Sequence, residues 1–124
     1  MWEIKLNSKE LKALNHLINE KVAELQRLNA LEIALRIGGS SSYFQDLITF
    51  STFLRERVNL ASPWRKEHIV EIKEKELQWA INFARDKMGQ LIRARANYYG
   101  QMTIDEFEKL IKKLEQRKGA KIVL

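Results

Sequence analysis

The chain has no cysteine and a single proline among its 124 residues. The missing cysteine excludes a disulfide framework, a thiolate metal site and a cysteine nucleophile. One proline and five glycines leave few interruptions, so the sequence predicts long continuous elements. The chain has two histidines, and neither stands in a metal-ligand spacing. We therefore expect no metal and no cofactor.

Long apolar runs are also missing. The longest apolar-leaning stretch, residues 47–54, includes Thr49, Ser51 and Thr52 and is far shorter than the roughly 20 residues of a membrane-spanning helix. The N-terminal residues do not show the basic and then apolar pattern of a signal peptide. We therefore expect a cytoplasmic protein that does not associate with a membrane.

Composition and charge indicate a globular protein with a modest basic excess. Hydrophobic residues make up 45% and charged residues 31% of the chain, and this length predicts one helical domain over residues 1–124. The net charge of +6 favours polyanionic partners. However, acids and bases alternate along much of the chain, as in residues 73–76, and such mixing is typical of solvated helix faces.

The N-terminal third predicts a strand followed by a long helix. Residues 2–6 alternate between apolar and polar side chains, which is the period of a strand. Asn7 and Glu10 have the spacing of a capping box, in which two side chains satisfy the first amide groups of a helix. Apolar residues then recur at spacings of three and four from Leu11 to Leu28, residues 30–37 are apolar in nearly every direction, and Gly38 ends the predicted helix. This pattern predicts a helix over about residues 8–37.

Two shorter helices are predicted over about residues 43–59 and 104–118 from their apolar spacing. Each begins at a pair of residues with capping-box spacing, in which the first residue is the N-cap. The pairs are Ser42 with Gln45, and Thr103 with Glu106. A third helix is predicted to begin at Ser62–Pro63, because serine is a favoured N-cap and proline a favoured first helical residue. The next clear stop is Gly100.

This third helix is therefore predicted over about residues 63–99, continuous or bent at Gly89. The tail, residues 120–124, is prone to form a strand and is expected to pair with residues 2–6. The sequence thus predicts an all-α fold: a four-helix bundle with two long helices, two shorter helices and short strands at the termini.

Two groups of acidic residues were considered as metal or acid–base sites. His16, Glu20 and Glu24 recur at helical spacing on the first helix. On the third predicted helix, a second ridge would carry three further carboxylates: Glu67, Glu71 and Glu74. The first group lies opposite the apolar stripe of its helix, where polar residues are expected, and the second lacks the second ligand motif of a helical metal site. We interpret both as solvated faces and expect no enzymatic activity.

A weak phosphate-binding hypothesis concerns the connection between the first two helices. Backbone amides and hydroxyl groups at a helix N-terminus bind anions, and an arginine lies close by in the sequence. The candidate residues are Arg36, Ser41 and Ser42. Their spacing matches neither of the common glycine-rich phosphate motifs, and a helix cap with a turn explains the same residues.

The leading functional hypothesis is a non-catalytic helical protein that acts through helix–helix surfaces and associates as a two-fold dimer. A helix of about 37 residues would be about 55 Å long, and the shorter helices would leave much of its wide apolar arc uncovered. A second copy, or another protein, would cover that arc. The candidate interface residues are Ile69, Ile72, Trp79, Phe83, Leu91 and Tyr98.

The alternative hypothesis is a nucleic-acid-binding protein. Arginines interleaved with tyrosines provide phosphate contacts and stacking surfaces, and further bases lie on the last predicted helix. The candidate residues are Arg85, Arg93, Arg95, Tyr99, Lys112 and Lys113. The competing interpretation is that the tyrosines and Arg95 are core or interface residues with polar tips.

Overall fold

A computed structural model describes residues 1–27, 40–60, 66–117 and 120–122. This part of the chain forms four helices: α1 (Ser8–Arg27), α3 (Ser40–Leu60), α4 (Glu74–Arg93) and α5 (Ile104–Gln116). It also forms five short strands: β1 (Trp2–Leu6), β2 (His68–Ile72), β3 (Tyr98–Tyr99), β4 (Met102–Thr103) and β5 (Lys121–Ile122). A mostly helical chain with short antiparallel strands is therefore confirmed.

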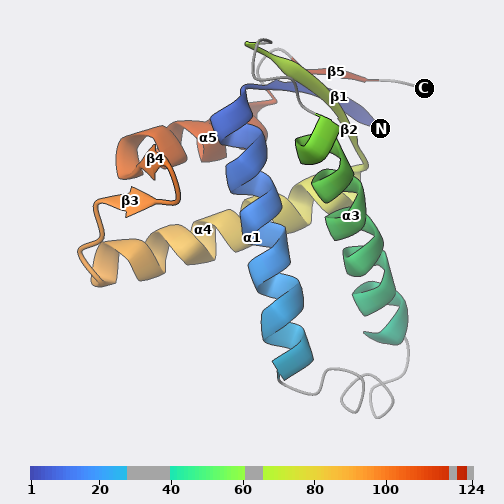
Figure 1. Ribbon diagram of the computed structural model, residues 1–124, viewed down its shortest axis with the longest axis horizontal. Coiled ribbons are helices and arrows are strands. Elements are labelled where there is room, and N and C mark those ends of the chain that lie inside the picture. Colours follow the sequence, from blue (N-terminus) through green and yellow to red (C-terminus); the bar gives the residue numbers. More distant parts are fainter. Residues whose placement is uncertain (28–39, 61–65, 118–119, 123–124) are drawn as a thin grey trace.

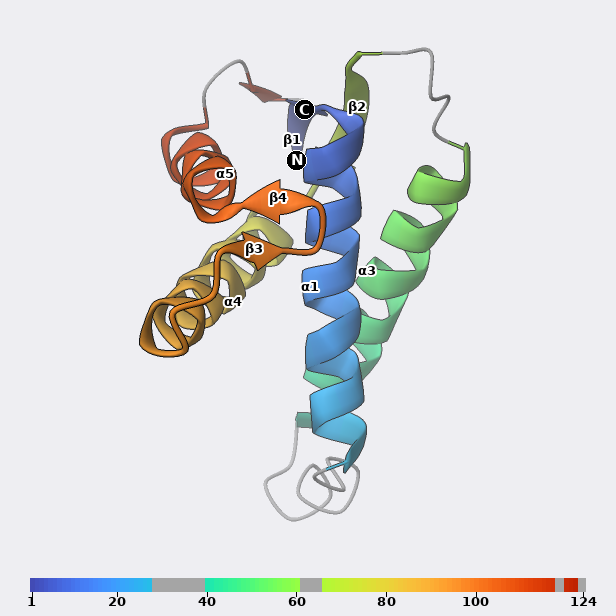
Figure 2. The same ribbon diagram turned by 60° about the vertical axis from the view of Figure 1, so that its left-hand side comes forward.

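The helices do not all run alongside one another. Helices α1 and α3 form an antiparallel pair, whereas α4 crosses α1 steeply, and α5 lies alongside α4 on the side where α1 begins (Figure 1). Turning the molecule shows the β3–β4 hairpin standing between α1 and the pair of α4 and α5 (Figure 2). A small sheet lies over the end where α1 begins.

The N-terminal strand is the middle strand of that sheet. Strand β1 pairs antiparallel with β2 on one side and with β5 on the other. The expected pairing of the tail with residues 2–6 is confirmed, with Trp2 opposite Ile122. Strand β2 is a partner that the sequence did not predict.

The predicted helix over residues 63–99 is wrong at both ends. Residues 68–72 form β2, in which Val70 and Ile72 point into the core while Ile69 is exposed. This alternation is the period of a strand, but a run of five residues is short enough to fit a helical arc as well. The predicted start at Ser62–Pro63 lies outside the described residues.

The other end of the predicted helix stops at Arg93 without a glycine. The amide of Ala96 donates to the carbonyl of Leu91 at 2.9 Å, and the amide of Arg95 donates to that of Ile92 at 3.1 Å. This pair of bonds is a Schellman cap, whose turning residue adopts the left-handed conformation usually filled by glycine. Here that residue is Arg95, with φ of 54°.

The remaining helix boundaries are close to those predicted. The capping boxes of α1 and α5 are both formed, with Asn7 and Glu10 bonding each other's amides at 2.8 and 2.9 Å. Helix α3 begins at Ser40, so Ser42 is not its N-cap as predicted. Helix α4 continues through Gly89 without the bend considered. The predicted continuation of the first helix over residues 28–37 lies outside the described residues.

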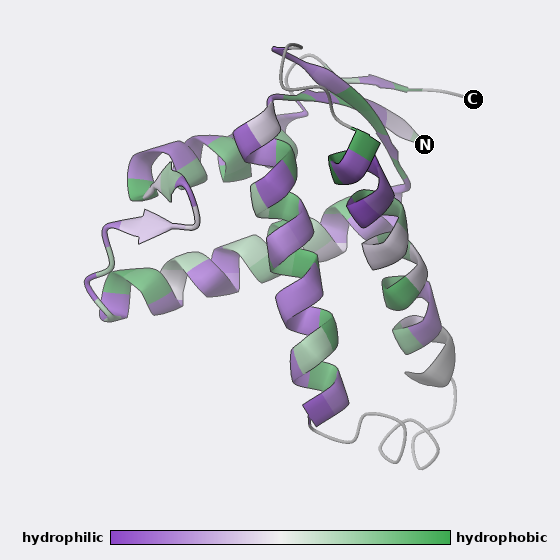
Figure 3. Cartoon of the chain, in the orientation of Figure 1, coloured by the Kyte–Doolittle hydropathy of each residue, from purple (hydrophilic) through white to green (hydrophobic). Residues whose placement is uncertain are grey.

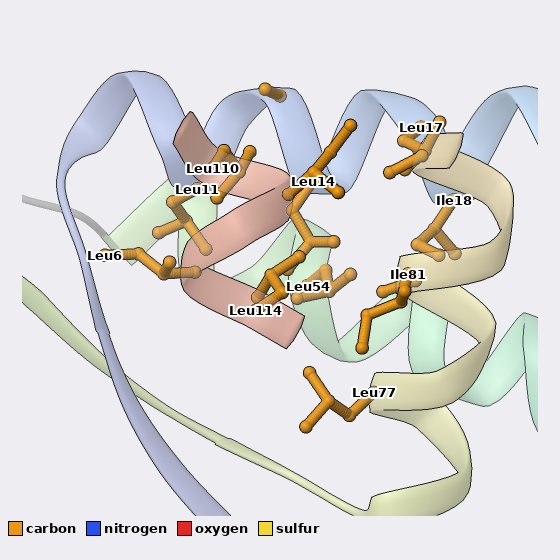
Figure 4. Packing of buried hydrophobic residues seen from close by; sticks show 14 of the residues in the cluster. Leu6, Leu11, Leu14, Leu17, Ile18, Leu54, Leu77, Ile81, Leu110 and Leu114 are labelled. Carbon is orange, nitrogen blue, oxygen red and sulfur yellow. The ribbon is translucent and has the colours of Figure 1, made fainter. Parts of the chain in front are cut away.

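The core gathers around α1. Its buried leucines meet apolar side chains from α3, α4, α5 and the inner face of the sheet, as Figure 4 shows for ten labelled residues. Hydrophobic and hydrophilic stretches alternate along each helix (Figure 3), which is the pattern of helices with one buried face. Buried Ser51 on α3 donates a hydrogen bond to Asn19 on α1.

Helix length gives no reason to expect a dimer in this structure. Helix α4 has 20 residues in place of the predicted 37 or so. Its apolar residues Leu77, Ile81 and Met88 are buried within the chain itself. An uncovered stripe on an overlong helix therefore gives no reason for self-association, and any such reason has to come from another surface.

Two isoleucines of β2 test its register. Ile72→Ala should lower the free energy of unfolding by about 2–4 kcal/mol, because a fully buried side chain leaves a cavity. Ile69→Ala should lower it by less than about 1 kcal/mol, because that side chain is 53% exposed. Urea unfolding followed by tryptophan fluorescence measures both, and equal losses would contradict the strand.

Candidate interaction surfaces

A groove of about 970 Å³ lies between the second halves of α1 and α4. It opens where the two helices diverge beyond their crossing point (Figure 1). Charged side chains of both signs line it: Glu20, Lys21, Glu24 and Arg27 from α1, and Arg85, Asp86, Lys87 and Arg93 from α4. The floor includes buried Leu17 and half-buried Phe83.

The ammonium group of Lys21 lies 5.2 Å from the centre of the Phe83 ring, within the range of a cation–π contact. Phe83 is one of the six predicted interface residues, and the other five do not line this groove. The groove therefore offers a small apolar floor between two charged walls, which is a common anatomy for a protein-binding surface.

Glu20, one of the residues that line the groove, joins three elements. Its carboxylate accepts a hydrogen bond from the hydroxyl of Tyr99 at 2.6 Å. The Lys87 ammonium lies 2.8 Å away and the Nε2 atom of His16 2.9 Å away. Helix α1, helix α4 and strand β3 thus meet on one side chain.

These contacts set the protonation of the cluster. Burial alone would raise the Glu20 pKa, but hydrogen bonds from Lys87 and Tyr99 and the charges of Lys87 and His16 hold it below 4.5. Burial and the neighbouring Glu20 carboxylate raise the pKa of Tyr99, so its hydroxyl remains a donor. Sequence reasoning treated Glu20 as solvated because Lys87 and Tyr99 lie far along the chain.

The structure does not bring the six predicted nucleic-acid-binding residues together. Tyr99 is 6% exposed and its ring packs on that of Phe107. Three bases face acids: Arg85 with Glu115, Lys112 with Glu108 at 3.7 Å, and Lys113 with Glu10 at 3.0 Å. Arg93 and Arg95 are exposed, and no described acid lies within salt-bridge distance of either.

A smaller hollow of about 220 Å³ separates α1 from the β3–β4 hairpin. Lys9, Lys12 and His16 line it on the α1 side, and the turn of Gly100 and Gln101 lines it on the other. Gly100 has φ of 59°, a conformation that glycine adopts without steric cost. Sequence reasoning missed this surface because its two sides lie far apart in the chain.

The other predicted interface residues are dispersed. Ile72 is fully buried in the chain's own core. Trp79 packs edge-on against Tyr43 of α3, with ring centres 5.1 Å apart, and Leu91 is partly buried against the core. Ile69 on the sheet and Tyr98 on the hairpin are exposed, but in different regions of the molecule (Figure 1).

The second acidic ridge is not formed. Glu67 precedes β2, Glu71 lies in β2 opposite Glu3, and Glu74 begins α4. The Glu74 carboxylate accepts hydrogen bonds from Trp2 and, at 2.5 Å, from Arg117. In the described part of the chain, no cluster of three or more histidines and acids could hold a metal ion.

Two further groups of polar residues lie outside these surfaces. For the phosphate hypothesis, Arg36 lies outside the described residues, while Ser41 and Ser42 fall in the first turn of α3. Ser8 Oγ and His68 Nε2 lie 3.1 Å apart, but neither residue lines either of the two cavities described above. None of the described helices is long and apolar enough to span a bilayer.

The Glu20 cluster should make stability depend on pH. A carboxylate whose pKa is lowered by folding stabilises the protein above its unfolded pKa of about 4.5, and the stabilisation is lost as the pH falls through the folded pKa. Glu20→Gln should therefore cost about 0.5–1 kcal/mol at neutral pH and progressively less below about pH 4.5.

Urea unfolding at a series of pH values measures this difference. Glu108→Gln serves as the control, since its side chain is 47% exposed and faces Lys112 at 3.7 Å on the same helix. A difference between the wild type and Glu20→Gln that stays constant from neutral to acid pH would show that the cluster does not act in this way.

Comparison with known proteins finds no counterpart. No protein-family model, curated protein or solved structure matches the chain. No similar protein therefore assigns a role to any of these residues, and the functional inference has to come from the geometry of the two surfaces.

Proposed function

We propose that the protein is a non-catalytic interaction protein that self-associates as a two-fold dimer through the groove between α1 and α4. The observation that carries this proposal is the distribution of charge in the groove. Its α4 wall has three bases and one acid, whereas its α1 wall carries two acids, Glu20 and Glu24, beside the two bases Lys21 and Arg27.

A two-fold axis through the groove would set the α1 wall of one copy against the α4 wall of the other. In such an isologous contact, every pair of residues occurs twice. In both halves of the contact, a wall with a net positive charge would then face a wall without net charge that carries two of the three acids of the groove. Complementary charge of this kind fixes the orientation of two partners, around the apolar floor formed by Leu17 and Phe83.

Glu24 and Arg93 are the pair best placed to meet across the axis. The Glu24 side chain is 51% exposed, and its described partner, Lys21, lies 3.5 Å away on the same helix. The exposed Arg93 guanidinium lies back along α4 toward Gly89. Both side chains line the groove, and neither belongs to the Glu20 cluster.

The titratable groups of the groove support a structural role over a chemical one. Glu20, the acid with the clearest pKa shift in the groove, already has partners in Lys87, Tyr99 and His16. A general acid or base needs a proton that it can exchange with a substrate. Because the Glu20 carboxylate already has its partners within the chain, we favour a structural role in which it links α1, α4 and β3.

A charge-swap experiment tests the dimer. Light scattering at tens of micromolar should give about twice 14.6 kDa for the wild type. Glu24→Arg alone and Arg93→Glu alone should each weaken the dimer by about tenfold or more, because each places two like-charge pairs across the axis. A mixture of the two variants should restore the wild-type mass, since a mixed dimer has two opposite-charge pairs.

The matched controls are Glu56→Arg on α3 and Lys109→Glu on α5, which reverse charges on exposed residues outside the groove. Both should leave the mass unchanged. A wild-type mass of 14.6 kDa at these concentrations would contradict self-association. A dimer whose single variants are not rescued on mixing would contradict this groove as the interface.

A further inference from the structure

The hollow of about 220 Å³ between α1 and the β3–β4 hairpin, here called the hairpin hollow, is lined by bases and, among the described residues, by no acid. The bases are Lys9, Lys12 and His16. Their spacings of three and four place them on one face of α1, beside the hairpin (Figure 2). The hairpin itself, residues 98–103, carries no charged side chain. The charge of the hairpin hollow therefore favours an anion.

Fold stability gives little reason for the two lysines at this place. Lys9 lies in the first turn of α1, where the helix dipole disfavours positive charge. Its described acidic partner, Glu106, lies 3.7 Å away and already accepts a hydrogen bond from the amide of Thr103 at 3.1 Å. No described acid lies within salt-bridge distance of Lys12. Both ammonium groups are therefore free to contact a ligand.

The wall behind these charges is apolar and aromatic. Ala13 is 8% exposed and Tyr99 6% exposed, and both line the hollow. The ring centre of His16 lies 5.4 Å from that of Tyr99. The Tyr99 hydroxyl already donates to Glu20 at 2.6 Å, and Lys87 lies 2.8 Å from that carboxylate, so Glu20 repels an anion only weakly. This wall suits a flat ring.

The two-residue turn of the hairpin supplies donors on the other side of the hollow. Gly100 has φ of 59° at the first of the two positions, which is typical of a type II′ turn. Within the described chain, neither the Gly100 amide nor the Gln101 amide donates to a backbone carbonyl. A Cβ atom at Gly100 would meet nothing within 4 Å beyond its chain neighbours, so the turn borders open space. Free amides of a turn are common donors to anions.

We propose that the hairpin hollow binds a small aryl phosphate, that is, a phosphate monoester carried on one aromatic ring. The phosphate lies between the ammonium groups of Lys9 and Lys12, and the ring packs on Tyr99 and Ala13. A phosphate monoester carries about two negative charges above its second pKa of about 6, and two ammonium groups match this charge. Lysine binds phosphate as a point charge, so the contact does not need a rigid arrangement.

Size and charge favour this ligand over others. The volume of the hollow is below the roughly 300–1,000 Å³ of pockets for drug-sized molecules, so one ring with one phosphate is a suitable size. A carboxylate has a single charge and would leave one lysine without a partner. A nucleic-acid strand would continue across the hairpin, where no base contacts its further phosphates. None of the residues that line the hairpin hollow lines the α1–α4 groove, so this inference does not depend on the proposed dimer.

Titration with phenyl phosphate tests the proposal, followed by amide proton–nitrogen NMR spectra at about pH 7.5, where the phosphate is a dianion. The wild type should bind with a Kd of about 1 mM or tighter, as expected for a ligand of this size. The largest shifts should fall on the amides of Lys12, Ala13 and Gly100. Inorganic phosphate and phenol should each bind about tenfold more weakly, because each makes only part of the contacts.

Three substitutions in the hairpin hollow separate binding from stability. Lys9→Ala combined with Lys12→Ala should weaken phenyl phosphate binding about tenfold or more. The melting temperature of this double variant should stay within about 2 °C of the wild type, because neither lysine has a strong partner in the described chain. Ala13→Met extends a side chain into the hollow and should weaken binding about fivefold or more while both lysines remain. Unchanged affinity in Ala13→Met would contradict binding inside the hollow.

The matched control is Lys5→Ala with Lys121→Ala, which removes the same charge from exposed residues of the sheet. It should leave the Kd within about twofold of the wild type, because these charges are screened from the hollow. Four further results would each overturn the proposal. They are no saturable shift up to about 10 mM phenyl phosphate, inorganic phosphate binding as tightly as phenyl phosphate, an equal loss in the control pair, or the largest shifts falling in the α1–α4 groove.

Discussion

The packing of α1 between α3 and α4 is the constraint on which the rest of the structure depends. Buried side chains of α1 face both neighbours, so the helix cannot shift without opening two contacts at once. Beyond the crossing point, α1 and α4 diverge, and this divergence creates the charged groove. Glu20 joins the two helices within this groove through its ion pair with Lys87.

Sequence periodicity predicted the helices well wherever local chemistry defines their ends. The capping boxes at Asn7 and Thr103 were readable because both partners lie within one turn. Strand β2 was missed because five residues fit either period, and because its partner strand, β1, lies far from it in the sequence. The end of α4 was missed because a Schellman cap with arginine in place of glycine leaves no local signal.

The candidate surfaces depend on contacts that the sequence could not supply. Phe83 and Arg95 were both singled out from local pattern, but the first for a helical stripe and the second for a basic segment. Their structural settings, a groove wall and a left-handed cap, come from tertiary packing. The two adjacent tyrosines also depend on tertiary packing. Tyr99, which was predicted to contact nucleic acid, is buried, whereas Tyr98, which was predicted to lie at an interface, is exposed.

The central position of β1 has a consequence for folding. Its two partners begin at residues 68 and 121, so the three-stranded sheet joins segments that are far apart in the chain. Contacts of this kind raise the contact order and slow folding. During synthesis, α1 and α3 can pair soon after both emerge, whereas β1 must wait for its second neighbour until residues 121–122 have left the ribosome. Until then its hydrogen-bonding edge is open to any other strand in reach.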